Sequence, residues 1–124
     1  MPRGTKNKRE SRISMVRLTD NEIFERLQST AGDCNIRLTY THKLFYIRLL
    51  EYAITHGASC LEGLKISLSV NEMSSCLSIS KRMVIQSLRV FSDCGILLRY
   101  RRNTFPANAC VTILKQEFYE RSKE

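Results

Sequence analysis

Two helix starts separated by a short break constrain the fold of this sequence more than any other feature. Ser69 and Ser80 each precede a run with apolar residues at helical spacing, and serine is a favoured N-cap because its hydroxyl accepts a bond from a free backbone N–H. Glu72 follows Ser69 by three residues, which is the capping-box pattern. We therefore expect two consecutive helices within residues 69–94, joined by a tight turn at residues 78–80.

The same two runs contain the residues needed for a shared core. Helices that cross at a wide angle need apolar residues at fixed offsets and a small residue where they touch. Ser74 takes the small-residue position, and Ser78 stands in the turn, where a residue other than glycine has to adopt a positive φ. The apolar offsets are filled by Met73, Leu77, Ile79, Val84 and Leu88.

A basic β-hairpin is expected directly after the second helix. Gly95 follows the last periodic residue, as glycine does at many helix C-termini. Residues 96–102 alternate as a strand, and residues 110–114 return as a second strand after a turn that contains Pro106. The first strand carries three arginines, Arg99, Arg101 and Arg102.

Two further helices are expected upstream. One begins after Thr19 with Glu22 as its capping-box partner, and the other runs from Thr39 to Gly57. The second is apolar nearly all round over residues 44–54, which indicates burial on more than one side, in part by a partner subunit. We interpret residues 58–64 as a linker, residues 65–68 as a brief strand and residues 116–124 as a short last helix. The expected fold class is α+β, mostly α.

Some side chains are assigned to the core from their type and position. Aromatic residues in an apolar helix pack in the core more often than they stack on a ligand. We apply this to Tyr40, Phe45, Tyr46 and Tyr52. Cys76 and Cys94 are expected to be buried as small hydrophobic residues.

The charge of the chain favours a polyanionic partner. The 124 residues include 20 Lys and Arg against 12 Asp and Glu, which gives a formal net charge of +8. Residues 1–17 and residues 81–103 each carry six basic residues and one acidic residue. Two basic blocks on a near-neutral body are typical of nucleic-acid binding. A solubilising tail and a solvated helix face would give the same charges.

The sequence offers little from which to build a catalytic or metal site. Its five cysteines are widely spaced without a Cys-x-x-Cys pair, and its two histidines, His42 and His56, are far apart. No glycine-rich phosphate loop and no close Cys–His pair is present. We therefore expect no metal, no cofactor and no enzymatic activity.

The length and hydropathy are those of one domain without a membrane span or secretory signal. Free thiols are typical of a reduced compartment, so we expect a cytoplasmic, nucleoid-associated protein. The expected organisation is a disordered basic arm over residues 1–17, a single domain over residues 18–120 and a tail over residues 121–124. Within the domain, residues 69–94 form the two-helix motif and residues 96–115 the hairpin.

Residues 68–113, extended upstream to Leu38, resemble winged-helix bacterial transcription regulators such as the MarR-like regulators and the DNA-binding domain of the cyclic-AMP receptor family. Residues 78–84, Ser-Ile-Ser-Lys-Arg-Met-Val, are similar to the turn that opens their recognition helix. Residues 93–97, Asp-Cys-Gly-Ile-Leu, are similar to their step into the wing. The resemblance implies a winged helix-turn-helix, with a three-helix core, a β-hairpin wing and an extra N-terminal helix.

The resemblance also implies which residues would contact DNA. The second helix of the motif lies in the major groove with its N-terminal residues at the base edges. Lys81, Arg82 and Gln86 are then candidate base readers, because Lys and Arg suit guanine and Gln suits adenine. Ser80 and Arg89 are candidates for phosphate contacts.

Further cations would extend this contact beyond the recognition helix. The wing would reach the backbone or the minor groove, and a flexible basic arm would add contacts of its own. The residues concerned are Arg99, Arg101 and Arg102 of the wing, and Lys6, Lys8 and Arg9 of the arm.

The leading hypothesis is a transcriptional regulator that binds specific double-stranded DNA sequences as a homodimer, with its dimer surface within residues 20–56. One alternative is an accessory protein of plasmid or phage replication, partition or conjugation. Another is a winged-helix module that binds other proteins and not DNA. A protein effector, or a small-molecule effector near Tyr46 and Tyr52, is left open.

Overall fold

The elements follow one another in the order expected for a winged helix. The computed structural model describes residues 17–101 and 110–121. Within them lie α2 (Asp20–Asp33), α3 (Tyr40–His56), β1 (Ala58–Ser59), β2 (Gly63–Ser67), α4 (Val70–Leu77), α5 (Lys81–Asp93), β3 (Leu97–Arg101), β4 (Cys110–Lys115) and the 3-10 helix η1 (Gln116–Phe118). The fold is α+β and mostly helical, as predicted. α3, α4 and α5 form the three-helix core, and α2 is the extra N-terminal helix.

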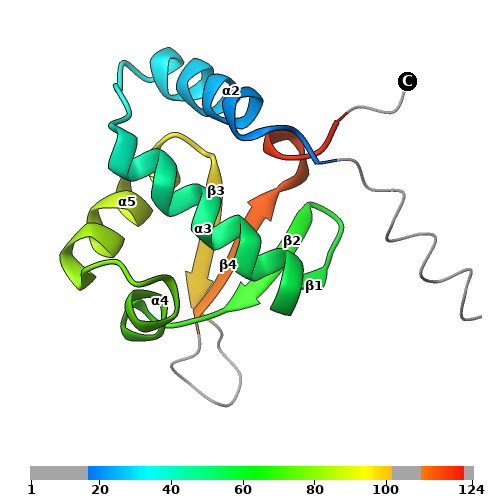
Figure 1. The fold of residues 1–124 in the computed structure, drawn as a ribbon, viewed down its shortest axis with the longest axis vertical. Coiled ribbons are helices and arrows are strands. Elements are labelled where there is room, and N and C mark those ends of the chain that lie inside the picture. Colours follow the sequence, from blue (N-terminus) through cyan, green and yellow to red (C-terminus); the bar gives the residue numbers. More distant parts are fainter. Residues whose placement is uncertain (1–16, 102–109, 122–124) are drawn as a thin grey trace, which may run out of the picture.

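The strands form one antiparallel sheet in the order β1-β2-β4-β3. Leu114 of β4 pairs with Leu64 of β2 on one side and with Leu97 of β3 on the other, which places three leucines side by side on the face that turns toward the helices. α3 runs across this sheet and contacts β2, while α5 contacts β3 (Figure 1). The contact with β3 thus ties α5 to the sheet.

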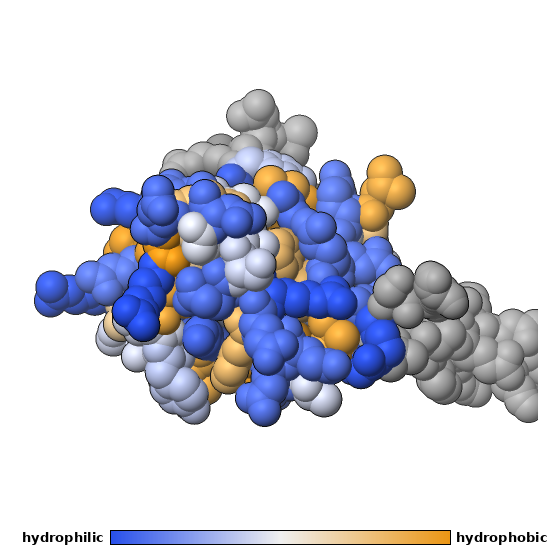
Figure 2. All heavy atoms as spheres, turned by 90° about the horizontal axis from the view of Figure 1, so that it is seen from above, coloured by the Kyte–Doolittle hydropathy of each residue, from blue (hydrophilic) through white to orange (hydrophobic). Residues whose placement is uncertain are grey.

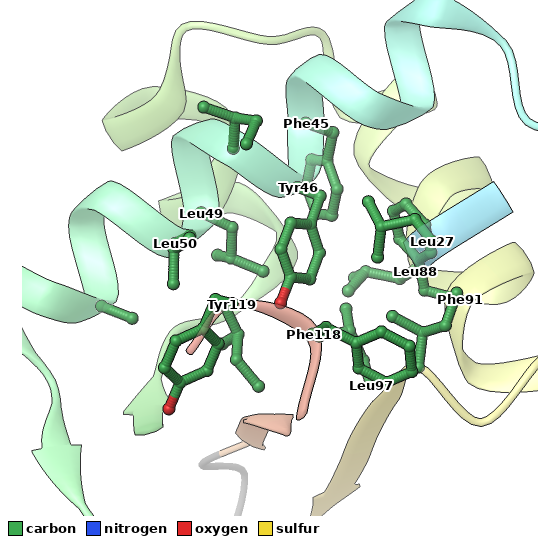
Figure 3. Close-up of a cluster of buried hydrophobic side chains, with 14 of the residues drawn as sticks. Leu27, Phe45, Tyr46, Leu49, Leu50, Leu88, Phe91, Leu97, Phe118 and Tyr119 are labelled. Atoms are coloured by element: carbon green, nitrogen blue, oxygen red, sulfur yellow. The ribbon is translucent and has the colours of Figure 1, made fainter. Parts of the chain in front are cut away.

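A single hydrophobic cluster joins the helices to the sheet. Its centre is aromatic: the Phe45 ring stacks on Phe91 at 6.2 Å between centroids, and Tyr46 meets Phe91 edge-on at 5.9 Å (Figure 3). Fully burying a side chain of this size is worth about 1.5–3 kcal/mol. Phe118, the last residue of η1, and the following Tyr119 complete the cluster from the far end of the chain.

The helix starts lie where the sequence predicts them. Thr19, Thr39 and Ser69 each form a capping box with the residue three positions on, and Ser80 accepts a bond from the N–H of Met83. Loss of such a cap costs about 0.5–2 kcal/mol. The predicted stop of α5 is also confirmed, because Gly95 follows the helix with a φ of +77°.

Two segments differ from the sequence prediction. Residues 58–64, expected as a linker, form a small hairpin in which Cys60 and Gly63 exchange backbone hydrogen bonds of 2.8 and 3.2 Å. Gly63 has a φ of +156°, and a Cβ there would lie 2.1 Å from the Leu114 carbonyl oxygen, so only glycine fits. The last helix expected over residues 116–124 is a single 3-10 turn at its start, because Phe118 and Tyr119 turn inward to the core.

Two core assignments are wrong. Tyr40 is 69% exposed because it is the first residue of α3 and precedes the part of the helix that the core covers. Cys76 is exposed because it lies on the side of α4 away from the buried Met73 and Leu77. The assignments of Phe45, Tyr46 and Cys94 are confirmed.

The two residues that flank the predicted domain both contact it. Arg17, predicted as part of the arm, pairs through its backbone with Glu120 and through its guanidinium with Asp20 at 3.1 Å. Arg121, predicted as part of the tail, bonds Glu22 at 3.2 Å. Both residues therefore belong to the folded part of the chain.

The end of the molecule near α2 presents mostly hydrophilic side chains, with small and separated apolar patches (Figure 2). In the described part of the chain, no helix combines the length and the apolar character needed to cross a membrane.

Candidate functional site

α5 divides its residues between two faces. Val84, Ser87, Leu88 and Phe91 are buried against the rest of the domain. The opposite side, which we call the exposed face of α5, consists of Lys81, Arg82, Ile85, Gln86 and Arg89, and each of these residues is exposed to solvent. The helical repeat of 3.6 residues brings these five side chains together. All three predicted base readers, Lys81, Arg82 and Gln86, thus share one surface with Arg89, a predicted phosphate contact.

The cations on this face form no ion pair among those described. The ion pairs described within residues 17–101 and 110–121 join Arg17 to Asp20 and Arg121 to Glu22, and none involves the exposed face of α5. Lys81 and Arg82 also lie in the first turn of α5, where the peptide dipoles already leave a partial positive charge. The surface is therefore suited to an anion.

The Ser80 hydroxyl caps α5 and can still donate a hydrogen bond of its own. Its hydroxyl oxygen accepts the Met83 N–H at 3.2 Å, which leaves the hydroxyl proton to donate elsewhere. The side chain is exposed at the start of the helix, beside Lys81. This position agrees with the predicted role of Ser80 as a donor to a phosphate.

The turn between α4 and α5 is held by several bonds. Ser78 adopts the left-handed conformation, with φ 56° and ψ 46°, so a residue other than glycine does take the strained position. The Ser74 hydroxyl donates to the Ile79 carbonyl at 2.7 Å, and the Ile79 N–H donates to the Ser74 carbonyl at 3.2 Å. Ser74 thus ties α4 to the turn that follows it.

Arg48 of α3 is a positioning residue that the sequence analysis missed. Its guanidinium donates to the carbonyls of Leu77 at 2.8 Å and Ser78 at 3.3 Å, where α4 has ended and these oxygens lack helical partners. Hydrogen bonds from a charged group contribute about 1.5–3 kcal/mol. The only signal in the sequence was a cation within an apolar stretch.

Arg99 is engaged with the protein. It is half-buried, and its guanidinium donates to the Leu68 carbonyl at 3.3 Å and to the hydroxyl of the buried Thr112. These bonds connect β3 to β4 and to the residue that precedes the cap of α4. Its contact with a polyanion stays a prediction.

Arg99 and Arg89 border the same groove. This groove has a volume of about 400 Å³ between the start of α4, α5 and β3, and Val70, Ile85 and Leu88 also line it. The structure thus places the wing strand next to the exposed face of α5.

Of the other cations predicted to contact DNA, most lie outside the described residues. Arg101 is the last residue of β3. Arg102, Lys6, Lys8 and Arg9 lie outside the described residues.

The region expected for a small-molecule effector is divided by the fold. Tyr46 is fully buried, and burial raises the pKa of its hydroxyl. Tyr52 instead packs on the His56 ring at 4.6 Å and borders a separate hollow of about 450 Å³ beside α4, together with Arg48. The two tyrosines therefore do not form one pocket.

The described histidine, cysteine and acidic side chains are dispersed, and one thiol has a raised pKa. No group of three or more histidine, cysteine or acidic side chains there is arranged to hold a metal ion. Burial, with a further contribution from nearby Cys34, raises the pKa of Cys94, and a raised thiol pKa lowers its reactivity.

Solved structures share this fold. One, described as the N-terminal domain of a DNA binding protein, aligns with a TM-score of 0.51 and 18% identity over 63% of this chain and 62% of its own. Another, described as the structure of a Rep-DNA complex, aligns with a TM-score of 0.51 and 18% identity over 70% of this chain and 66% of its own. This chain thus spans just under two thirds of each. At this identity the likeness shows the fold alone. No protein-family model matches the sequence, and the search of curated proteins gives no significant match.

Proposed function

We propose that this protein binds double-stranded DNA and recognises its sequence by placing α5 in the major groove. The observation that carries the proposal is the exposed face of α5, where cations and an amide gather without a described carboxylate partner. An α-helix fits the major groove, where Lys and Arg pair with guanine and Gln pairs with adenine. Lys81, Arg82 and Gln86 lie exposed on one side of the helix and would make these contacts.

The remaining contacts would fix the orientation of the helix on the duplex. Arg89 lies two turns from the start of α5, where the phosphate backbone passes a helix that lies in the groove, and Ser80 can donate to a phosphate at the other end. The wing arginines and the basic arm would add backbone or minor-groove contacts. Arg48 acts through the turn, because it holds the end of α4 from which α5 begins.

The structural neighbours support this proposal. One is a domain of a DNA binding protein and the other was solved as a Rep-DNA complex, and both share the fold described above. Duplex DNA is a common partner of this arrangement of helices.

For the biological role, we propose a cytoplasmic transcriptional regulator that acts without catalysis as a homodimer through residues 20–56. One recognition helix covers only a few base pairs, and a dimer doubles the site. An accessory role in replication is the second candidate, which the likeness to the chain of the Rep-DNA complex favours.

The test of DNA binding is an anisotropy titration of the full chain on random duplex DNA at two salt concentrations, followed by selection of a preferred site. We expect affinity to fall steeply with salt and a palindromic site to be enriched. Arg82→Ala should weaken this binding. Arg121→Ala is its matched control and should not, because Arg121 is exposed outside α5 and outside residues 20–56, and pairs with Glu22 at 3.2 Å. No binding at low salt would reject the proposal and favour a module that binds proteins.

The role is tested separately, once a site is known. Transcription from a promoter that overlaps the selected site should change when the protein is added. Unchanged transcription at saturating occupancy would reject the regulator and favour the replication role.

A further inference from the structure

One side chain on the exposed face of α5 differs in kind from its neighbours. Ile85 is a large apolar residue, and it is 44% exposed. Lys81 lies four residues before it and Arg89 four residues after it, so the three side chains form one row along the helix. Gln86 stands beside this row and is also exposed. An apolar surface therefore interrupts the polar surface that we propose faces DNA.

The packing of α5 does not depend on this side chain. The buried contacts of the helix are made by Val84, Ser87, Leu88 and Phe91. Ile85 borders the groove of about 400 Å³ on one side and is open to solvent on the other. A polar residue at this position would leave the core of the domain intact. Single exposed apolar residues are common on proteins. What distinguishes Ile85 is its position between Lys81 and Arg89.

We propose that Ile85 contacts the 5-methyl group of a thymine in the major groove and thereby sets a preference for thymine at one position of the site. This proposal rests on the function proposed above. Among the unmodified bases, thymine alone presents an apolar group in the major groove, and apolar side chains read it. Ile85 lies in the second turn of α5, within the N-terminal part of the helix that approaches base edges in this docking mode.

The experiment removes the methyl group from the DNA and the side chain from the protein. Each thymine of the selected site is replaced in turn by deoxyuridine, which pairs as thymine does but lacks the methyl group. The proteins compared are the native chain, Ile85→Ala and the matched control Leu61→Ala. Leu61 is an aliphatic residue of the same size and is 94% exposed, but it lies between β1 and β2, outside α5 and outside the proposed dimer surface.

At one thymine we expect the native chain and Leu61→Ala to lose about fourfold in affinity on the deoxyuridine site, the factor that corresponds to one buried methyl group. Ile85→Ala should bind the thymine and deoxyuridine sites equally. Circular dichroism of Ile85→Ala should match that of the native chain.

Other outcomes separate this inference from the proposed function. Specific binding by a native chain that is indifferent to deoxyuridine at every thymine would overturn the inference alone. Retention of the fourfold loss by Ile85→Ala, or selection of a site without thymine near α5, would do the same. Absence of any salt-sensitive DNA binding would overturn the proposed function and this inference together.

Discussion

At the scale of single residues, Lys81 and Arg82 are placed at a cost to the isolated protein. They occupy the first turn of α5, and a cation at a helix N-terminus is disfavoured by about 0.3–1 kcal/mol. An anion bound at the same place reverses the sign of this interaction, because the free N–H groups and the two side chains then act together. Their position therefore favours the binding of an anion and slightly destabilises the free helix.

Replacing either residue by alanine tests this interpretation. Lys81→Ala or Arg82→Ala should each weaken binding to the selected site by about 1–3 kcal/mol and weaken binding to random DNA less. Competition titrations against both DNAs give the two values. Equal losses on every sequence would contradict the base-reading role and leave these residues as phosphate contacts.

Glu22 gives a second prediction at this scale, for the dependence of stability on pH. The backbone N–H of Thr19 donates to its carboxylate at 2.9 Å, and this bond, assisted by Arg121, holds the pKa of Glu22 below its usual value. A carboxyl group with a lowered pKa in the folded state contributes stability above its unfolded pKa and loses it as the pH falls through the folded pKa. Glu22→Gln should therefore lower the Tm at pH 7, and the difference should disappear in acid below the usual carboxyl range.

The control for this measurement is Glu25→Gln on the same helix, an exposed residue with no hydrogen bond described here. Its Tm at pH 7 should match that of the native chain, because the substitution removes no described hydrogen bond. A difference between Glu22→Gln and the native chain that stays constant with pH would show that the charge of Glu22 contributes nothing.

At the scale of elements, the turn between α4 and α5 combines strain with support. Ser78 is held in the left-handed region, which costs a residue with a Cβ about 1–2 kcal/mol. The bonds from Arg48 and Ser74 offset this cost and fix the direction in which α5 leaves the turn. α5 is therefore positioned by contacts with both α3 and α4.

Ser78→Gly should relieve the strain without removing these bonds, because Arg48 binds backbone carbonyls. Glycine pays about 0.5–1 kcal/mol in chain entropy, so we expect a net gain of roughly 0.5–1 kcal/mol in the free energy of unfolding. Ser75→Gly is the matched control, since Ser75 is exposed within α4, and it should lower the stability by a similar amount. Urea denaturation measures both, and a loss for Ser78→Gly would show that the turn is not strained.

The elements that sequence analysis predicted well depend on local rules. The caps at Ser69 and Ser80 require only residues three or four positions away, and the serine in the left-handed turn follows from its place between two helices. The pairing of β2 with β4 and the bonds of Arg48 and Arg99 join segments about 30 residues apart or more, which spacing along the chain does not reveal. Ile85 is not singled out by the sequence, because charged and amide side chains are the usual signals of base readers.

At the scale of the whole molecule, the excess positive charge lies in two segments, one that includes α5 and one at the N-terminus. The charge on α5 is fixed by a helix, whereas residues 1–16 precede the described chain, which starts at Arg17. Arg17 is tied to Asp20 and to the backbone of Glu120, so a truncation should stop before it.

Deletion of residues 1–16 should lower the salt dependence of DNA binding and leave the Tm unchanged. The slope of log affinity against log salt should become shallower by about 0.9 for each phosphate contact that the arm makes. Anisotropy titrations over a range of salt give the slope, and thermal melts give the Tm. An identical slope for both proteins would show that the arm makes no contact with DNA.

The pairing of Arg17 and Leu18 with Tyr119 and Glu120 also bears on how the chain acquires its fold during synthesis. The Leu18 N–H donates to the Tyr119 carbonyl at 2.8 Å, and the neighbouring Phe118 fills the core between helices formed much earlier in the sequence. Residues that complete the core are thus among the last of the described chain to leave the ribosome, after α2 to α5. A nascent chain halted near residue 115 would therefore carry formed helices over an open apolar core, a state that chaperones bind and proteases cut.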